Sequence, residues 1–150
     1  MGSEVRPMKT SAQFSLSVHA MLMIACFPEG KITSEMVAES AGCNPVIIRN
    51  AFIKLRRAGL LTPKSGKGRN TLTRPAETIT LWDIYSAIEG EQAGLPVRVH
   101  DTASGTCPVG SRVCRILSDH IAEAADAMRR ALARVSLADL RGEIASASRS

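Results

Sequence analysis

The sequence predicts a mostly α-helical chain with one small β-hairpin and a long helix near its C-terminus. Apolar residues recur at helical spacing through most of the chain, and one Gly-rich segment with strand-like flanks interrupts them. A heptad pattern runs from Cys114 to Val135, within a long helix that we expect over residues 108–135. With 150 residues, 45% of them hydrophobic, the chain can bury one modest core but not two large ones.

The N-terminal part begins with residues 1–9, which we expect to be disordered, and continues into a helix. The core-facing positions of this helix are Phe14, Val18, Met21, Leu22 and Ala25. The same run imitates a secretion signal with a weak lipoprotein box ending at Cys26, but His19 and two serines interrupt it. Four cysteines are too sparse for a disulfide framework, and no apolar run can span a bilayer, so we expect a reduced, cytoplasmic chain.

Two short helices separated by a glycine turn follow. Thr33 can cap a helix over residues 34–41, and Gly42 ends it. Asn44 then caps the next helix, and Pro45 occupies its first position. This order of helix, turn and helix predicts a helix-turn-helix.

The second of these helices has two distinct faces and ends at Gly59. Four apolar residues recur at core spacing, namely Ile48, Ala51, Phe52 and Leu55. The opposite side is expected to be exposed, and it comprises Val46, Ile47, Arg49, Asn50, Ile53, Lys54 and Arg57. Val46 and Ile47 are aliphatic residues at the start of this exposed face, so their exposure needs an explanation.

A basic hairpin is predicted over residues 60–73. Two strand-like pieces flank the tip Ser65–Asn70, which contains two glycines. A loop bearing Lys64, Lys67 and Arg69 beside a helix-turn-helix is typical of the wing of a winged helix. The glycine pair is not a nucleotide-binding fingerprint, because it neither follows a buried strand nor opens a helix.

One stretch of the chain accounts for the whole net positive charge of +5. From Ser40 to Ala76 there are eight Lys and Arg and no acid, whereas the other 11 of the 19 basic residues are outnumbered by 14 acids. Such a patch neutralises nucleic-acid phosphates, and Val46 and Ile47 suit thymine methyl groups in a major groove. The alternative to DNA contact is that Val46 and Ile47 pack against a neighbouring helix. The predicted contacts to double-stranded DNA are Val46, Ile47, Arg49, Asn50, Lys54, Lys64, Lys67, Arg69 and Asn70.

The C-terminal half is expected to hold a long helix over residues 108–135 between two short ones. Capping boxes at Thr80–Asp83 and Ser136–Asp139 start the short helices. The long helix carries a heptad seam of Cys114, Leu117, Ile121, Ala124, Met128, Ala131 and Val135. Because a small domain covers only part of such a helix, we expect a homodimer, with folding back onto its own core as the alternative. The expected divisions are 1–9, disordered; 10–90, winged helix-turn-helix; 91–107, linker or sensor loop; and 108–150, dimerisation helix and tail.

Two longer stretches resemble the Rrf2 family of bacterial winged-helix repressors. They are VAESAGCNPVIIRNAFIKLRRAGLL and LTRPAETITLWDIYSAIEG, within a match over about residues 8–145. Asn44-Pro45-Val46 and Cys107-Pro108-Val109-Gly110 resemble in particular the YwnA-like branch. The resemblance implies a dimer that binds a palindromic operator and responds to a redox, metal-cluster or small-molecule signal. It also implies that Val46, Ile47 and Arg49 face bases and that the wing tip approaches the minor groove.

The cysteines depart from the cluster-binding members of that family. Those members place three closely spaced cysteines before the dimer helix, whereas this chain offers only Cys107 and Cys114 there. Two thiolates do not complete a four-ligand iron–sulfur site, so we expect no cofactor and no metal. The alternative is a regulator that senses an iron–sulfur cluster. Its missing ligands would come from His100, Asp101 or His120, or from both subunits.

Three cysteines are candidates for an oxidant sensor. Cys43 and Cys107 precede helices whose dipoles can lower a thiol pKa, and Cys114 lies on the seam near its symmetry mate. Cys26 is expected to be a core residue. A half-buried structural role is the alternative for Cys43.

We therefore expect a dimeric DNA-binding regulator, a repressor of palindromic operators in which a thiol-based response to an oxidant, or a small-molecule effector, is an option. A cysteine-dependent enzyme would need a paired thiol or a Cys-His-acid set, and the spacings provide neither, so no enzyme is predicted. A winged helix that only binds proteins is the remaining alternative, but it would not need an acid-free recognition helix and wing.

Overall fold

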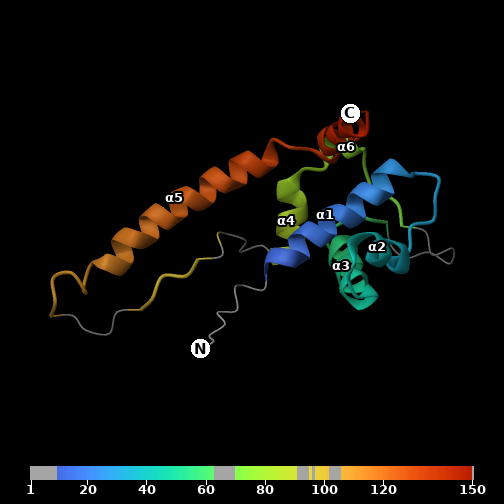
Figure 1. The fold of residues 1–150 in the computed structure, drawn as a ribbon. Coiled ribbons are helices and arrows are strands. Elements are labelled where there is room, and N and C mark those ends of the chain that lie inside the picture. The colour runs from blue at the N-terminus through green and yellow to red at the C-terminus, as the bar shows by residue number, and fades with distance from the viewer. Residues whose placement is uncertain (1–9, 63–69, 91–94, 96, 102–105, 150) are drawn as a thin grey trace.

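The computed structural model describes residues 10–62, 70–90, 95, 97–101 and 106–149. Its helices are α1 (Thr10–Cys26), α2 (Ser34–Ala41), α3 (Pro45–Arg57), the 3-10 helix η1 (Ala76–Thr78), α4 (Leu81–Glu89), α5 (Val113–Ala133) and α6 (Leu137–Ala147). Helices α1 to α4 and α6 form a body, and α5 extends away from it as an arm (Figure 1). The expected disordered segment, residues 1–9, lies outside the described residues.

The predicted helix-turn-helix is confirmed at its caps. Thr33 accepts a hydrogen bond from the Met36 N–H at 3.1 Å, and Asn44 accepts one from the Val46 N–H at 2.9 Å. Between them Gly42 has a φ of 72°, in the left-handed region that glycine adopts without a Cβ clash. The turn between α2 and α3 is therefore determined by a few local residues.

Each helix of the body contributes apolar side chains to one core. The largest fully buried ones include Met21, Val37, Ile48, Leu55, Ile84 and Leu137. All four predicted core residues of α3 are buried. In α1 the buried face is rotated from the prediction, because Ala20 and Ile24 are buried while Val18 and Leu22 are only half-buried.

The predicted β-hairpin is reduced to a bridge in the described residues. Leu61 and Leu72 pair in antiparallel fashion, with the Thr62 N–H donating to the Thr71 carbonyl oxygen at 2.9 Å, and no strand is formed in the described chain. The Thr73 N–H also donates to the Leu60 carbonyl oxygen at 3.1 Å, so the pairing continues on the side away from the tip. The tip of the predicted wing, with Lys64, Lys67 and Arg69, lies outside the described residues.

The C-terminal helix α6 packs against α1 and η1, so it is part of the body rather than a tail. Thr80 and Ser136 form an antiparallel bridge, and the Leu137 N–H donates to the Ile79 carbonyl oxygen at 2.8 Å. Both predicted capping boxes are present, at Thr80–Asp83 and Ser136–Asp139. The structure therefore extends the body beyond the expected boundary at residue 90.

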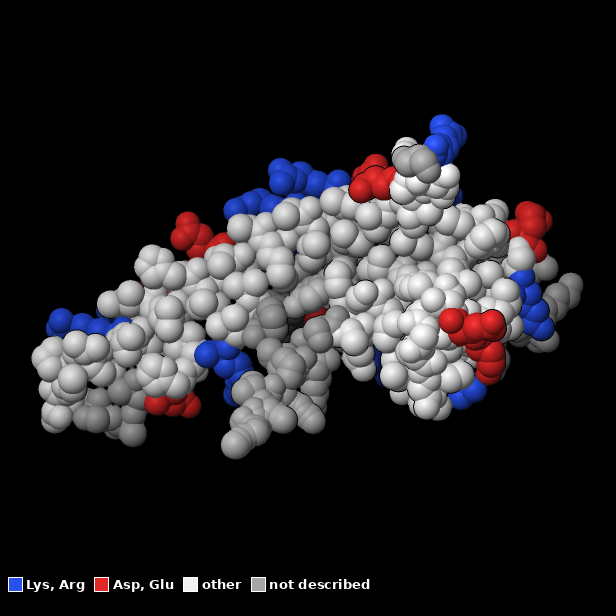
Figure 2. All heavy atoms as spheres, viewed as in Figure 1, with Lys and Arg blue, Asp and Glu red and all other residues white. Residues whose placement is uncertain are grey.

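Helix α5 is shorter than predicted and buries none of its residues. It starts at Val113 instead of residue 108, because the segment from Cys107 to Arg112 forms turns, in which the Ser111 N–H donates to the Cys107 carbonyl oxygen at 2.9 Å. Gly110 in this segment disfavours a helix. Charged side chains lie mainly along one edge of α5, and much of the face in view is uncharged (Figure 2).

The described helices contain no segment with the length and apolar character needed to cross a membrane.

Candidate nucleic-acid interface

Helix α3 presents one stripe of side chains directly away from the core. Val46, Asn50, Ile53 and Arg57 follow each other at intervals of three and four residues, and all four are exposed. Val46 is 51% and Ile53 is 44% exposed. The stripe is opposite the buried face of the helix and contains no acidic residue. Ile53 and Arg57 were recognised as exposed from the sequence but were not among its predicted DNA contacts, although their helical spacing places them with Val46 and Asn50.

On the flank of α3 that faces α2, Arg49 forms an ion pair with Glu35. The Arg49 guanidinium donates a hydrogen bond to the Glu35 carboxylate at 2.9 Å, and both side chains are more than half exposed. This hydrogen bond is the main reason that the pKa of Glu35 lies below its ordinary value. Both residues line a groove of about 330 Å³ between α2, α3 and Asn70.

Asn70 occupies a different position from the predicted one. Its side chain is buried, donates to the Ile32 carbonyl oxygen at 3.0 Å and accepts from the Arg56 guanidinium at 2.6 Å. Arg56 also lies over the ring of Phe52, 5.7 Å from its centroid. Asn70 therefore joins the segment after the predicted wing tip to α3 and to the loop before α2, and its amide is engaged within the fold.

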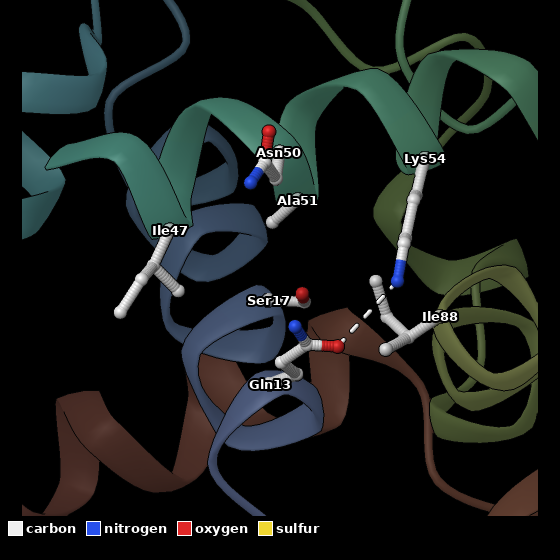
Figure 3. Close-up of a pocket in the computed structure, with 7 residues that line it drawn as sticks. All are labelled: Gln13, Ser17, Ile47, Asn50, Ala51, Lys54 and Ile88. Atoms are coloured by element: carbon white, nitrogen blue, oxygen red, sulfur yellow. Dashed lines mark hydrogen bonds between the residues drawn. The ribbon is translucent and has the colours of Figure 1, made fainter. Parts of the chain in front are cut away.

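The flank of α3 that faces α1 holds two predicted contacts close to the body. Lys54 donates to the side-chain oxygen of Gln13 at 3.4 Å, and Ile47 lies beside the small pocket that separates α3 from α1 (Figure 3). Ile47 stays 37% exposed at this position, and Asn50 borders the same pocket. Lys54 points toward α1 rather than outward. The other predicted contacts from α3 are exposed, namely Val46, Ile47, Arg49 and Asn50.

The pocket between α1 and α3 is too small for an effector. Ser17 on its wall is fully buried, and its hydroxyl oxygen has no hydrogen-bond partner in the described chain. The cavity measures about 10 Å³, which is roughly the space of one water molecule.

Cys107 has the most distinctive environment of the four cysteines. It is exposed, and the Gly110 N–H donates to its Sγ at 3.4 Å. Hydrogen bonds from the backbone N–H groups of Gly110 and Val109 lower the pKa of the Cys107 thiol. Because α5 starts only at Val113, these donors belong to a turn and not to the predicted helix cap.

The remaining cysteines are half-buried. Cys43 packs against the core, and the Cys114 thiol donates to the His100 carbonyl oxygen at 2.8 Å. Cys26 differs from the prediction, since it lines an apolar groove of about 450 Å³ between α1 and α6 instead of lying in the core. The rotation of the buried face of α1 explains this position.

Residues 10–143 match the model of the Rrf2 family, which is described as an iron-dependent transcriptional regulator. The chain belongs to the Rrf2 family. It is therefore a DNA-binding transcriptional regulator and not an enzyme. A relative of Bacillus subtilis strain 168, named "Putative HTH-type transcriptional regulator YwnA", is 27% identical over 130 residues, which cover 87% of this chain and 95% of the relative.

Solved structures of two Rrf2 regulators share the fold. CymR of B. subtilis, described as the global cysteine regulator, has a TM-score of 0.64 and 24% identity, over 90% of this chain and 97% of CymR. IscR of T. potens has a TM-score of 0.63 and 22% identity, over 94% of this chain and 91% of IscR. At this identity the likeness concerns the fold alone.

The Rrf2 description names iron, and an iron site needs protein ligands. The described residues of one subunit do not supply such a set. No three Cys, His, Asp or Glu side chains of the described residues gather closely enough to hold a metal ion. The Cys114 thiol is engaged with a carbonyl oxygen, which leaves Cys107 as the one exposed thiol near the start of α5. These residues do not fit an iron–sulfur cluster.

Proposed function

We propose that this Rrf2 protein is a homodimeric repressor that occupies a palindromic operator in a bacterial cytoplasm. The observation that carries the proposal is the outward stripe of α3, which exposes Val46 and Ile53 together with Asn50 and Arg57. Apolar groups can contact thymine methyls, an amide can pair with adenine, and a guanidinium can bind guanine or phosphate. An exposed surface of this composition on the second helix of a helix-turn-helix suits a major groove.

The arm supports the dimer. None of the 21 residues of α5 is buried, and Ile116 and Leu117 are 51% and 40% exposed. The seam residues Ile121 and Met128 are half-buried. A second copy of the arm, related by a two-fold axis, would remove this apolar surface from water. Two-fold symmetry in the protein would in turn require two-fold symmetry in the operator.

Within this dimer we assign separate roles to the parts of the chain. Residues 10–90, with α6 packed on them, bind DNA; residues 91–107 carry the signal; and α5 joins the subunits. Cys107 is the favoured thiol sensor, because it is exposed, its pKa is lowered and it precedes the arm. Cys43 is the weaker candidate, because it is half-buried against the core.

The proposal is tested by selecting bound sequences from a library of randomised duplex DNA with the purified protein. We expect an inverted repeat with half-site centres about one helical turn apart, and an affinity that falls steeply with salt. Arg49→Ala should relax selection at one base position at a cost of about 1 to 3 kcal/mol, whereas Lys67→Ala should weaken binding to all sequences alike.

Two outcomes would contradict parts of the proposal. If neither Arg49→Ala nor Lys67→Ala changes binding to the selected DNA, α3 and the wing are not the DNA-binding surface. For the sensor, diamide should abolish binding by the wild type but not by Cys107→Ser. A response that disappears in Cys43→Ser instead would assign the sensor to the turn between α2 and α3.

A further inference from the structure

Glu35 is an acidic residue on the DNA-binding side of a basic domain. It belongs to the first turn of α2, and acidic side chains gather over this helix (Figure 2). A carboxylate beside the recognition helix repels the phosphates of a bound duplex, so it weakens non-specific binding. Its presence at this position therefore calls for a role other than affinity.

The ion pair between Glu35 and Arg49 contributes little to folding. The side chains are 63% and 52% exposed, and exposed pairs of this kind add little to stability because water and salt screen them. The hydrogen bond is nevertheless short, with 2.9 Å between the guanidinium nitrogen and the carboxylate oxygen. The contact thus has good geometry and little value for the fold.

The effect of the contact is on the direction of the Arg49 side chain. Arg49 lies on the α2 flank of α3, beside the outward stripe, and a free arginine there could reach several phosphates or bases. A guanidinium has five N–H donors in a rigid fork, and Glu35 engages the Nη2 end of that fork. The remaining donors stay available for the O6 and N7 acceptors of a guanine.

We propose that Glu35 is a specificity-determining residue that positions Arg49 to bind one guanine of the operator and keeps it from binding phosphates. This inference rests on the proposed DNA-binding surface. Glu35 itself need not touch DNA; it acts through Arg49. The carboxylate lowers the affinity for all DNA and raises the discrimination at one base pair.

The experiment uses the full-length protein and duplexes selected by it from a randomised library. Each position of the selected half-site is replaced in turn, and an unrelated duplex of the same length reports non-specific binding. For Glu35→Ala we expect discrimination at one base pair to fall about tenfold or more, at the position affected by Arg49→Ala. Binding to the unrelated duplex should stay equal or increase.

Two further variants separate positioning from charge. Glu35→Gln removes the charge but keeps an oxygen that accepts from Arg49, so its discrimination should lie between wild type and Glu35→Ala. Glu39→Ala is the matched control, since Glu39 is an exposed acid one turn further along α2 and has no such contact among the interactions of the described residues. It should leave discrimination unchanged. Thermal unfolding should be alike for all variants.

The outcomes are distinguishable from failure of the proposed function. If the wild type selects no sequence, both the proposed function and this inference fail. If Arg49→Ala alters discrimination but Glu35→Ala does not, Arg49 binds a base without help and only this inference is overturned. Equal effects of Glu35→Ala and Glu39→Ala would reduce Glu35 to a general electrostatic role.

Discussion

The body and the arm of this protein differ in where they bury their apolar side chains. Helix α3 has 13 residues and buries four of them within its own chain, whereas α5 has 21 residues and buries none. Both helices are amphipathic in sequence. An amphipathic helix gains most of its stability from the surface against which it packs, so the two helices depend on different partners.

The difference has a direct consequence for the effects of substitutions. The body contains its own core, with side chains from five α-helices and from η1, and should unfold as a cooperative unit. The arm needs a second arm in the proposed dimer, and its stability should therefore depend on protein concentration. Substitutions in the two regions should affect unfolding and association separately.

The largest effect is expected at the middle of the arm. Ile121→Glu would place two like charges against each other in the dimer seam, at a cost on the order of 3 to 5 kcal/mol or more of association free energy. Sedimentation should show a monomer, while circular dichroism shows a folded body. Glu123→Ala, on the exposed side of α5, is the control. A dimer that survives the first change and dissociates with the second would place the seam on the other face.

A core truncation in the body should have the complementary effect. Ile48→Ala removes part of a fully buried side chain of α3 and should lower the free energy of unfolding by about 2 to 5 kcal/mol. The same truncation on the arm, Ile121→Ala, should cost less in a dilute sample, where α5 is unpaired. Urea titrations at several protein concentrations measure both, and equal losses at every concentration would remove the distinction between body and arm.

Two asparagines of the body are predicted to bind DNA, and their substitutions should have different effects. Asn70→Ala leaves Arg56 and the Ile32 carbonyl oxygen without their partner and should lower the free energy of unfolding by about 1 to 3 kcal/mol. Asn50→Ala, on the exposed stripe, should change stability by less than about 0.5 kcal/mol but weaken binding to the selected DNA. If Asn70→Ala weakened DNA binding without loss of stability, and Asn50→Ala did the opposite, Asn70 would be the DNA contact.

The smallest effect concerns the segment that joins body and arm. Because the N–H groups of Gly110 and Val109 lower the pKa of Cys107 in the folded chain, its thiolate should form at a lower pH than after unfolding. A variant with the other three cysteines changed to Ser allows alkylation by iodoacetamide to be followed against pH. The midpoint should be lower in buffer than in urea, and coinciding midpoints would show that the turn does not act on this thiol.

The residues that the sequence located well are those whose structure depends on near neighbours. Thr33, Asn44, Thr80 and Ser136 cap helices through hydrogen bonds that span two or three residues, and the buried face of α3 follows from its own periodicity. The predicted start of α5 failed for a related reason. Turn formation between Cys107 and Arg112 competes with the helix over a segment that contains glycine, and the heptad pattern alone does not report this competition.

The sequence by itself therefore determined the helix-turn-helix, the basic character of residues 40–76 and the family. Tertiary structure decided which flank of α3 each predicted contact occupies. Arg49 meets Glu35 across 14 residues of sequence, Asn70 meets Ile32 across 38, and Leu137 of α6 completes a core that starts in α1. Such contacts depend on how helices pack in space, and no periodicity within a single helix records the packing of its neighbours.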